Sequence, residues 1–175
     1  MSLEVHHARA PRALTVQIVT LSDTRDPSSD TSGGGIRAAV ESAGHTVRGP
    51  WIVREDPVTL ATELRALLSE PGVDAVIING GTGIAPRDLA FDILSRLYSR
   101  PMPGFGELFR ALSFVEIGAA AMLSRASAGV VGDRVVFSIP GSPAAVRLAL
   151  ERLILPELAH CVGELRRGHV PEGRR

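Results

Sequence analysis

The stretch that decides the fold is "VDAVIINGGTGIAPRDLAFDILSRLY", residues 73–98. Its first seven residues are nearly all apolar, which is typical of a central strand covered on both faces. Three of the next four residues, Gly80, Gly81 and Gly83, have no side chain, and a helical pattern follows. Glycine costs backbone entropy and contributes no packing. The loop therefore predicts either an unusual backbone path or the close approach of a ligand.

The rest of the chain alternates between strands and helices in the same way. Apolar, β-rich segments predict strands at 14–21, 45–53, 126–132 and 134–140, and Gly132-Asp133 is expected to join the last two as a hairpin. Helical patterns predict helices at 36–44, 57–70, about 88–98, 105–125 (as two short helices) and 142–168, the last one bent or broken near Pro156. This order predicts an α/β three-layer sandwich with a mostly parallel central sheet plus one antiparallel hairpin.

We expect a single domain over residues 13–168, with a flexible leader at 1–12 and a flexible tail at 169–175. Of the 175 residues, 45% are hydrophobic and 22% are charged, and the formal net charge is zero. This balance argues against a general nucleic-acid or anionic-membrane binder. No apolar run reaches the roughly 20 residues of a membrane helix, and we expect no signal peptide. With a single cysteine, Cys161, no internal disulfide can form, so we expect a cytoplasmic protein.

The composition also restricts the chemistry. All 19 basic residues are arginine. A Walker-type phosphate loop and a Schiff base both require lysine, so both are excluded. An anion held by a side chain would be held by arginine, which binds phosphate in a bidentate manner.

Three distinctive loops follow strand ends, at 22–35, 79–88 and 140–143. Ligands of open α/β sheets bind beyond the carboxyl ends of the strands, so we expect these loops to form one site. The middle loop offers backbone N–H groups ahead of a helix, the Thr82 hydroxyl and the Arg87 guanidinium, which together favour an anion. A dinucleotide fingerprint is absent.

Each loop also has a structural interpretation. Asp88 would serve as the N-cap of the following helix, and Ser142 would cap the next one with Pro143 at its first position. The loop at 22–35 has more hydroxyls and carboxylates than a simple connector needs, which favours a role in the site. A mobile, solvated loop is the alternative interpretation.

None of the three loops contains histidine or cysteine. A Ser-His-Asp or Cys-His mechanism therefore has no base, and a zinc site has no soft ligands. The remaining groups are carboxylates, hydroxyls, arginine and backbone amides. They are the groups used in phosphoryl or nucleotidyl transfer, in which carboxylates hold magnesium.

Five motifs in order resemble a known family. They are "SDTR…DTSGGG", "INGGTGIAPRD", "PGFGELFRALS", "AMLSRASAG" and "SIPGSPAAV". Together they look like the MoaB/Mog family of molybdenum cofactor biosynthesis proteins over roughly residues 13–160. The form "PGFGELFRALSFVEIG" resembles the MoaB branch more than the MogA branch.

The resemblance implies a protein that binds molybdopterin and adenylylates it with ATP and Mg²⁺, releasing pyrophosphate. It implies catalytic and metal-binding roles for Asp88 and Glu55. The substrate and nucleotide site that it implies consists of Ser22, Asp23, Asp30, Ser32, Gly33, Asn79, Gly80, Gly81, Thr82, Gly83, Arg87, Ser124, Arg125, Pro140, Gly141 and Ser142. It also implies a homotrimer or homohexamer, and we expect neither nucleic acid nor a membrane as a partner.

One departure from the family pattern concerns the second carboxylate. The Mog-type enzymes have an aspartate in a "PDE" motif after the second strand, whereas this chain reads "VREDP" and has Glu55 there. The alternative function is therefore a non-catalytic, oligomeric molybdopterin-binding paralogue that acts as a carrier or assembly partner.

Overall fold

The structure is a computed structural model that describes residue 11 and residues 13–167. Its strands are β1 (Thr15–Leu21), β2 (Thr46–Val53), β3 (Ala75–Asn79), β4 (Arg100–Pro101), β5 (Ser127–Val131) and β6 (Arg134–Ile139). Its α-helices are α2 (Thr31–Ser42), α3 (Leu60–Leu68), α4 (Ala90–Leu97), α5 (Pro103–Ile117), α6 (Pro143–Ala149) and α7 (Leu155–Arg167). The expected leader and tail lie outside the described residues, apart from position 11.

The six strands form one sheet in the order β2-β1-β3-β6-β5-β4. The first four of these are parallel to one another, and β5 runs antiparallel to both β6 and β4. This arrangement confirms the mostly parallel sheet and the hairpin through Gly132, whose φ is +61°. Both edge strands contain a proline, Pro50 in β2 and Pro101 in β4.

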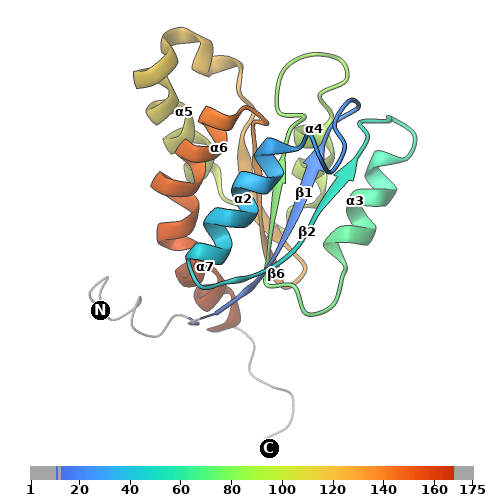
Figure 1. Ribbon diagram of the computed structural model, residues 1–175. Helices are drawn as coiled ribbons and strands as arrows, with labels where there is room; N and C mark the ends of the chain where they lie inside the picture. The colour runs from blue at the N-terminus through green and yellow to red at the C-terminus, as the bar shows by residue number, and fades with distance from the viewer. Residues whose placement is uncertain (1–10, 12, 168–175) are drawn as a thin grey trace, which may run out of the picture.

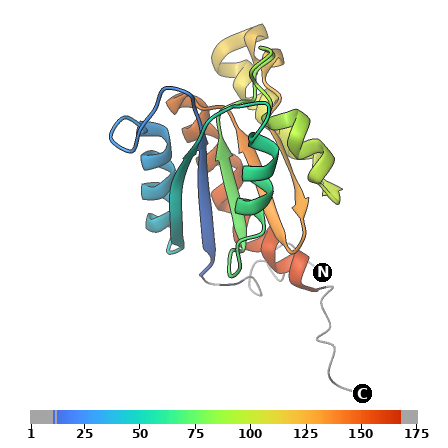
Figure 2. The ribbon, with the colours of Figure 1, turned by 90° about the vertical axis from the view of Figure 1, so that its right-hand side faces the viewer.

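Helices cover both faces of the sheet, as Figures 1 and 2 show. The core against α2, α5, α6 and α7 includes Ile18 and Ile77, and the core against α3 and α4 includes Val19 and Ile78. Neighbouring residues of one strand thus face opposite layers, because successive strand side chains alternate between the two faces. The central strands are therefore apolar on both faces, as the sequence predicted.

Several helix boundaries differ from the sequence prediction. The segment expected as a loop up to residue 35 is helical from Thr31 onward, because buried Asp30 caps α2 by accepting a hydrogen bond from the Gly33 amide at 2.9 Å. Helix α3 begins at Leu60, after Pro57 rather than around it. Instead of two short helices at 105–125, one α-helix runs to Ile117 and a 3₁₀ helix follows at Gly118–Leu123.

The C-terminal segment has the irregularity expected near Pro156. A π-helical stretch, Leu150–Ile154, joins α6 to α7 just before the proline. Proline has no N–H and its ring disfavours the preceding turn, so regular α-helical bonding is interrupted there. Cys161 packs half-buried against the core.

Candidate functional site

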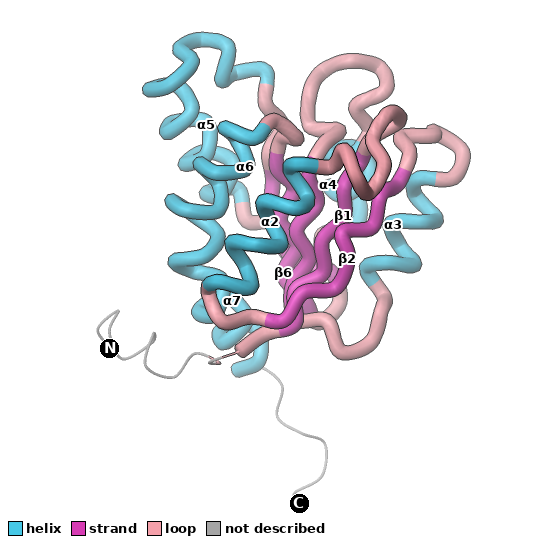
Figure 3. The backbone as a smooth tube through the Cα atoms, in the orientation of Figure 1, coloured by secondary structure: helices cyan, strands magenta, loops and turns pink. Residues whose placement is uncertain are grey.

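The candidate site lies at the carboxyl ends of the parallel strands. The loops after β1, β2 and β3 gather at one end of the sheet (Figure 3), and the loop after β6 joins them. At that point an added Cβ on Gly141 would lie 3.4 Å from the Cα of Gly80. The structure thus brings the three loops singled out from the sequence together, and adds the loop after β2.

The glycines of the loop after β3 make room for groups of the protein itself. Gly80 and Gly81 have φ values of +104° and +63°, which L side chains rarely adopt. An added Cβ would collide with the Leu21 carbonyl oxygen at Gly80, and with the Glu55 carboxylate at Gly81. At Gly83 it would lie 2.5 Å from a carboxylate oxygen of Asp88. The loop is therefore bare mainly because two carboxylates and a carbonyl occupy the space.

The backbone amides of this loop are nevertheless available. Within the described residues, the N–H groups of Gly81, Thr82 and Gly83 donate to no protein acceptor. The loop is fixed instead through its carbonyls, since Gly81 accepts from the Ala90 amide at 3.2 Å and Thr82 from the Arg125 amide at 2.8 Å. Adjacent free N–H groups form an anion-binding concavity.

Asp88 is not the cap of the next helix. Helix α4 begins at Ala90 with Leu89 in the cap position, and the Asp88 carboxylate turns back to accept from the Ala85 amide at 2.8 Å. Its second oxygen has no hydrogen-bond partner within the described residues. The N-cap interpretation was therefore wrong, because the side chain closes its own loop instead.

Three carboxylates from three loops surround the glycine loop. Asp23 accepts from the Glu55 amide at 3.1 Å, and Glu55 accepts from the Leu89 amide at 3.4 Å. Burial raises the pKa of Glu55, and the negative charges of Asp88 and Asp23 raise it further. The Leu89 hydrogen bond and Arg87 oppose this shift. Burial and two neighbouring carboxylates therefore disfavour the charged form of Glu55.

A magnesium ion fits this donor set. Mg²⁺ in nucleotide sites is bound through one or two carboxylates plus substrate phosphates rather than by an all-protein cage. Within residue 11 and residues 13–167, no three or more His, Cys, Asp or Glu side chains are grouped so that they alone could hold a metal ion. Glu55 and Asp88, which repel each other and flank the free amides, are the residues that would hold the ion.

Arg125 holds the glycine loop from the opposite side. Its guanidinium donates to the carbonyl oxygens of Gly83, at 2.8 Å, and of Asp88, and it forms an ion pair with Asp92 at 2.9 Å. The same group lies 5.3 Å from the ring centroid of Phe91. Arg125 therefore lies beside the glycine loop, but its donors are used by the protein. Neighbouring Ser124 accepts from the Ala126 amide at 3.3 Å.

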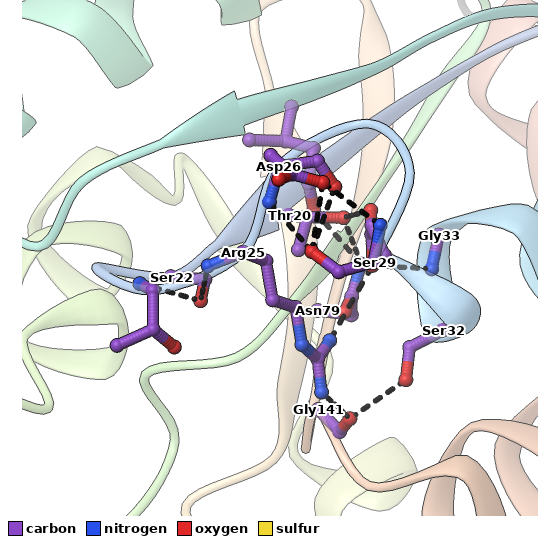
Figure 4. Close-up of polar contacts among 12 residues, drawn as sticks. Thr20, Ser22, Arg25, Asp26, Ser29, Ser32, Gly33, Asn79 and Gly141 are labelled. Carbon is purple, nitrogen blue, oxygen red and sulfur yellow. Dashed lines mark hydrogen bonds and ion pairs between the residues drawn. The ribbon is translucent and has the colours of Figure 1, made fainter.

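The loop between β1 and α2 is held together by its own side chains (Figure 4). Buried Asp30 accepts from the Thr20 hydroxyl at 2.6 Å as well as from Gly33, and forms an ion pair with Arg25 at 3.4 Å. The Thr20 hydroxyl in turn accepts from the side-chain NH₂ group of Asn79 at 2.9 Å. Asp30 and Asn79 therefore both bind the Thr20 hydroxyl, and both have a structural role inside the candidate site.

The outer part of the same loop is an ordered turn. Hydrogen bonds from Ser28 and Ser29 lower the pKa of Asp26 to about 2. The Ser22 hydroxyl accepts from the amides of Thr24 and Arg25. This outer part of the loop is exposed to solvent, and these hydrogen bonds give it a defined turn.

The third loop is bound to the first one through a single carbonyl oxygen. Gly141 accepts from the Ser32 hydroxyl at 2.8 Å and from Arg25 at 3.1 Å. Ser142 caps α6 with Pro143 in its first turn, as expected, and Pro140 directly follows β6. Arg25 was not among the predicted site residues, although it is the arginine of "SDTR".

Few of the predicted site residues have polar groups that remain available to a ligand. They are the amides of Gly81, Thr82 and Gly83, the carboxylates of Asp88 and Glu55, and the exposed Arg87, which makes no ion pair within the described part of the chain. Asn79 adds a buried side-chain oxygen, Oδ1, that has no hydrogen-bond partner within the described residues, and most of the others hold the loops.

Comparison with known proteins gives a consistent result. The profile of the family described as "Probable molybdopterin binding domain" matches residues 17–160. The chain is 45% identical over 168 residues to the Molybdenum cofactor biosynthesis protein B of Bacillus subtilis, covering 95% of this chain and 99% of that protein.

Two solved structures show the same fold. A crystal structure of Molybdenum cofactor biosynthesis protein B has a TM-score of 0.85 and 46% identity, with 90% of this chain and 99% of that chain covered. The tungsten cofactor synthesizing protein MoaB from Pyrococcus furiosus has a TM-score of 0.77 and 34% identity, covering 90% and 99% respectively.

Proposed function

The chain belongs to the molybdenum cofactor biosynthesis family that includes protein B (MoaB), and on this premise we propose that it adenylylates molybdopterin with ATP and Mg²⁺. Its role in molybdenum cofactor biosynthesis follows from the family. The adenylyl transfer is the proposal.

The observation that supports the proposal is the combination of three free amides with two mutually repelling carboxylates. The amides of Gly81, Thr82 and Gly83 suit the phosphate oxygens of a nucleotide. Glu55 and Asp88 suit the magnesium ion that accompanies those phosphates. Within the described residues, neither the amides nor the carboxylates have sufficient partners. A magnesium–nucleotide complex would supply phosphate oxygens to the amides and a cation to the carboxylates.

In the proposed reaction, a phosphate oxygen of molybdopterin attacks the α-phosphorus of ATP. The new P–O bond forms as the bond between that phosphorus and the oxygen bridging to the β-phosphate breaks, and pyrophosphate leaves with the electron pair. A phosphate monoester is largely dianionic at pH 7, since its second pKa is about 6. The nucleophile therefore needs no histidine base, in keeping with the residues present.

The chain's own residues position the reactants in this scheme. The free amides would hold the phosphate oxygens, Glu55 and Asp88 would hold the magnesium ion, and the exposed guanidinium of Arg87 would add positive charge beside the phosphates. The ion would supply charge neutralisation on the phosphates. Arg125, Arg25 and Asp30 fix the loops so that these groups converge, which is the main contribution that a protein makes to such a transfer.

We also propose that the protein is a homotrimer or homohexamer. Among the apolar residues of α5, Phe105 and Phe109 are buried in the core, whereas Leu108 and Phe114 are 57% and 61% exposed. Beyond them, exposed apolar side chains continue along the end of α5 and the 3₁₀ helix: Val115, Ile117, Met122 and Leu123. This segment extends beyond the sandwich (Figure 1), so it is well placed to contact other subunits.

No helix within the described residues could cross a bilayer. The proposed reaction needs ATP, and we accordingly place it in the cytoplasm.

The direct test is incubation of the purified chain with molybdopterin, ATP and MgCl₂, followed by chromatography of the products. We expect adenylylated pterin and pyrophosphate in equal amounts, and neither in the presence of excess EDTA. Binding of molybdopterin without any product would instead favour the carrier function, for which the replacement of the family's aspartate by Glu55 is the structural reason. A light-scattering mass of one subunit would contradict the proposed assembly.

A further inference from the structure

A cavity of about 370 Å³ lies beside the edge strand β2, and none of its lining residues belongs to the candidate site. We call it the β2 cavity. It is lined by Gln17 from β1, by Arg48 and Trp51 from β2, and by Leu67 and Glu70 from the end of α3 and just past it. The volume is within the range of about 300–1,000 Å³ typical of small-molecule sites.

A β-bulge in β2 places Arg48 and Trp51 on the same wall of this cavity. Arg48 pairs with Gln17 and Trp51 pairs with Val19, so two residues of β2 lie opposite the single Ile18. In a regular strand, residues three positions apart face opposite sides of the sheet. The extra residue turns both side chains toward the layer that contains α3. Bulges that redirect a side chain in this way are common beside functional sites.

Gln17 is the observation that points to a ligand. Its side chain is only 1% exposed, and its NH₂ group donates to the Leu67 carbonyl oxygen at 2.9 Å. Its oxygen, Oε1, accepts no hydrogen bond from the described residues. This oxygen is not fully enclosed by protein, and Gln17 lines the β2 cavity, so the oxygen opens into that space. Because buried side-chain oxygens nearly always have a partner, Oε1 is suited to accept from a ligand N–H.

The other polar groups around the cavity are also available. Trp51 is 52% exposed, and its indole N–H has no acceptor within the described residues. The Arg48 guanidinium donates to the Pro71 carbonyl oxygen at 2.8 Å and forms no ion pair in the described part of the chain. In the same part of the chain, the Glu70 carboxylate has no ion pair either. Exposed charges are ordinarily solvated, so the selectivity of the cavity comes mainly from the indole ring and the buried oxygen of Gln17.

We infer that the β2 cavity binds a purine base with an exocyclic amino group, the chemistry shared by adenosine and guanosine. The flat ring stacks on the indole of Trp51. The amino group donates to Oε1 of Gln17, and an acceptor on the edge of the ring receives a hydrogen bond from Arg48. A purely apolar ligand would leave Gln17 without a partner, and a simple anion would leave Trp51 uncovered. The inference does not depend on adenylyl transfer at the glycine loop.

The experiment uses the tryptophan of the cavity as its reporter. Trp51 is the only tryptophan in the sequence, so quenching of its fluorescence reports on stacking in the β2 cavity. The purified chain is titrated separately with adenosine and with guanosine, which have no phosphate for the glycine loop. Purine riboside, which has the same ring system and ribose but no amino group, is the ligand control.

We expect adenosine or guanosine to quench the fluorescence with one site in each subunit, and the two titrations show which base is preferred. We expect purine riboside to bind at least about tenfold more weakly than the preferred nucleoside, because it offers no amino group to Gln17.

Three variants locate the bound nucleoside by calorimetry. Trp51→Ala removes the stacking surface from a half-exposed position, and Gln17→Met removes the acceptor at similar length. Each should weaken binding by about tenfold or more. Arg65→Met is the control and should bind like the parent, because Arg65 is exposed on α3 and does not line the cavity. Thermal melts and light scattering check that each variant is folded and keeps its subunit mass.

Several results would overturn the inference. The first is a folded parent that binds neither nucleoside. Equal affinity for purine riboside and the amino-bearing nucleosides would show that Gln17 does not read the amino group. Binding that persists in Trp51→Ala would place the nucleoside elsewhere. A change of subunit mass in Trp51→Ala would assign the cavity to a subunit interface instead. None of these results bears on adenylyl transfer, which has its own test.

Discussion

The β1–α2 loop and the glycine loop after β3 both looked like anion sites, yet they differ in how far the protein satisfies its own polar groups. In the β1–α2 loop, Asp26, Asp30, Ser22 and Ser32 all have hydrogen-bond partners within the chain. In the glycine loop, three amides and one oxygen of Asp88 have none among the described residues. Polar composition alone therefore does not single out a ligand site, and the unsatisfied groups of the glycine loop are the basis of the proposed one.

The strongest test of this difference compares Asp88→Asn with Asp26→Asn. Both aspartates accept hydrogen bonds from nearby amides of their own loop, and asparagine can keep an acceptor there. Only Asp88 faces the proposed magnesium and phosphate charges. We expect Asp88→Asn to reduce adenylylation a hundredfold or more, about 3 kcal/mol in the barrier.

In the same comparison, Asp88→Asn should keep molybdopterin binding and near-normal thermal stability, and Asp26→Asn should turn over like the parent. The measurement is initial product formation, together with a thermal melt. Equal turnover by Asp88→Asn and the parent would remove Asp88 from the reaction and leave Glu55 as the carboxylate to examine.

The second test concerns stability and should affect the β1–α2 loop. Asp30→Ala removes the cap of α2 and leaves the Thr20 hydroxyl, the Gly33 amide and Arg25 without their shared acceptor. We expect a loss of about 2–4 kcal/mol in the free energy of unfolding, measured by urea denaturation. Asp26→Ala, in the exposed part of the same loop, is the control and should be much less affected. Similar losses in both variants would mean that burial of Asp30 does not matter.

The third test uses the three consecutive glycines at the start of α2. At Gly33 an added Cβ would lie 2.8 Å from the Thr20 hydroxyl oxygen and would collide with Asp30, whereas at Gly34 nothing lies within 4 Å. We expect Gly33→Ala to destabilise the protein by about 1–3 kcal/mol. Gly34→Ala should stabilise it by about 0.5–1 kcal/mol, because alanine is the better helix former. Thermal melts of the two variants would show shifts of opposite sign; shifts of the same sign would contradict the packing described.

The smallest effect is a pH dependence at Glu55. Its pKa is raised above its ordinary value of 4.5, so the folded protein binds this proton more tightly than the unfolded chain does. Stability from this group is present below pH 4.5 and is lost as the pH rises through the raised value. Glu55→Gln carries no charge and should therefore gain stability over the parent as the pH rises from 4 to 8. The control is Glu63→Gln on the exposed side of α3.

Thermal melts at several pH values, with and without MgCl₂, measure this effect. Magnesium should stabilise the parent more than Glu55→Gln, because the ion offsets the repulsion among Glu55, Asp88 and Asp23. A stability difference that is constant from pH 4 to 8 would show that the carboxylate is not strained by burial and its neighbours.

The layered fold and the position of the loops could be predicted from the sequence, because apolar runs such as 73–79 and the Gly132-Asp133 turn act locally. The start of α2 could not, since it depends on Asp30 being buried against Thr20. Likewise, the sequence leaves a cap as an alternative role for Asp88, and only the folded loop shows that its carboxylate accepts from the Ala85 amide instead.

The role of arginines could be predicted even less. The lack of lysine suggested that arginine would hold an anion. Instead, Arg25 donates to the carbonyl oxygen of Gly141. Arg125 donates to the carbonyl oxygens of Gly83 and Asp88. Such contacts join residues that lie 116 and 42 positions apart for the first two pairs. They arise only when the sheet brings the loops together, so no local pattern reveals them.

The prolines of the two edge strands have a consequence for how molecules of this protein can aggregate. Pro50 in β2 and Pro101 in β4 each lack the N–H that a further strand would need, and β4 is only two residues long. Neither edge therefore offers a continuous template for adding strands from another chain. Even in a crowded solution, this protein should resist growth into extended sheets and fibrils, so that contacts between copies are left to its helices.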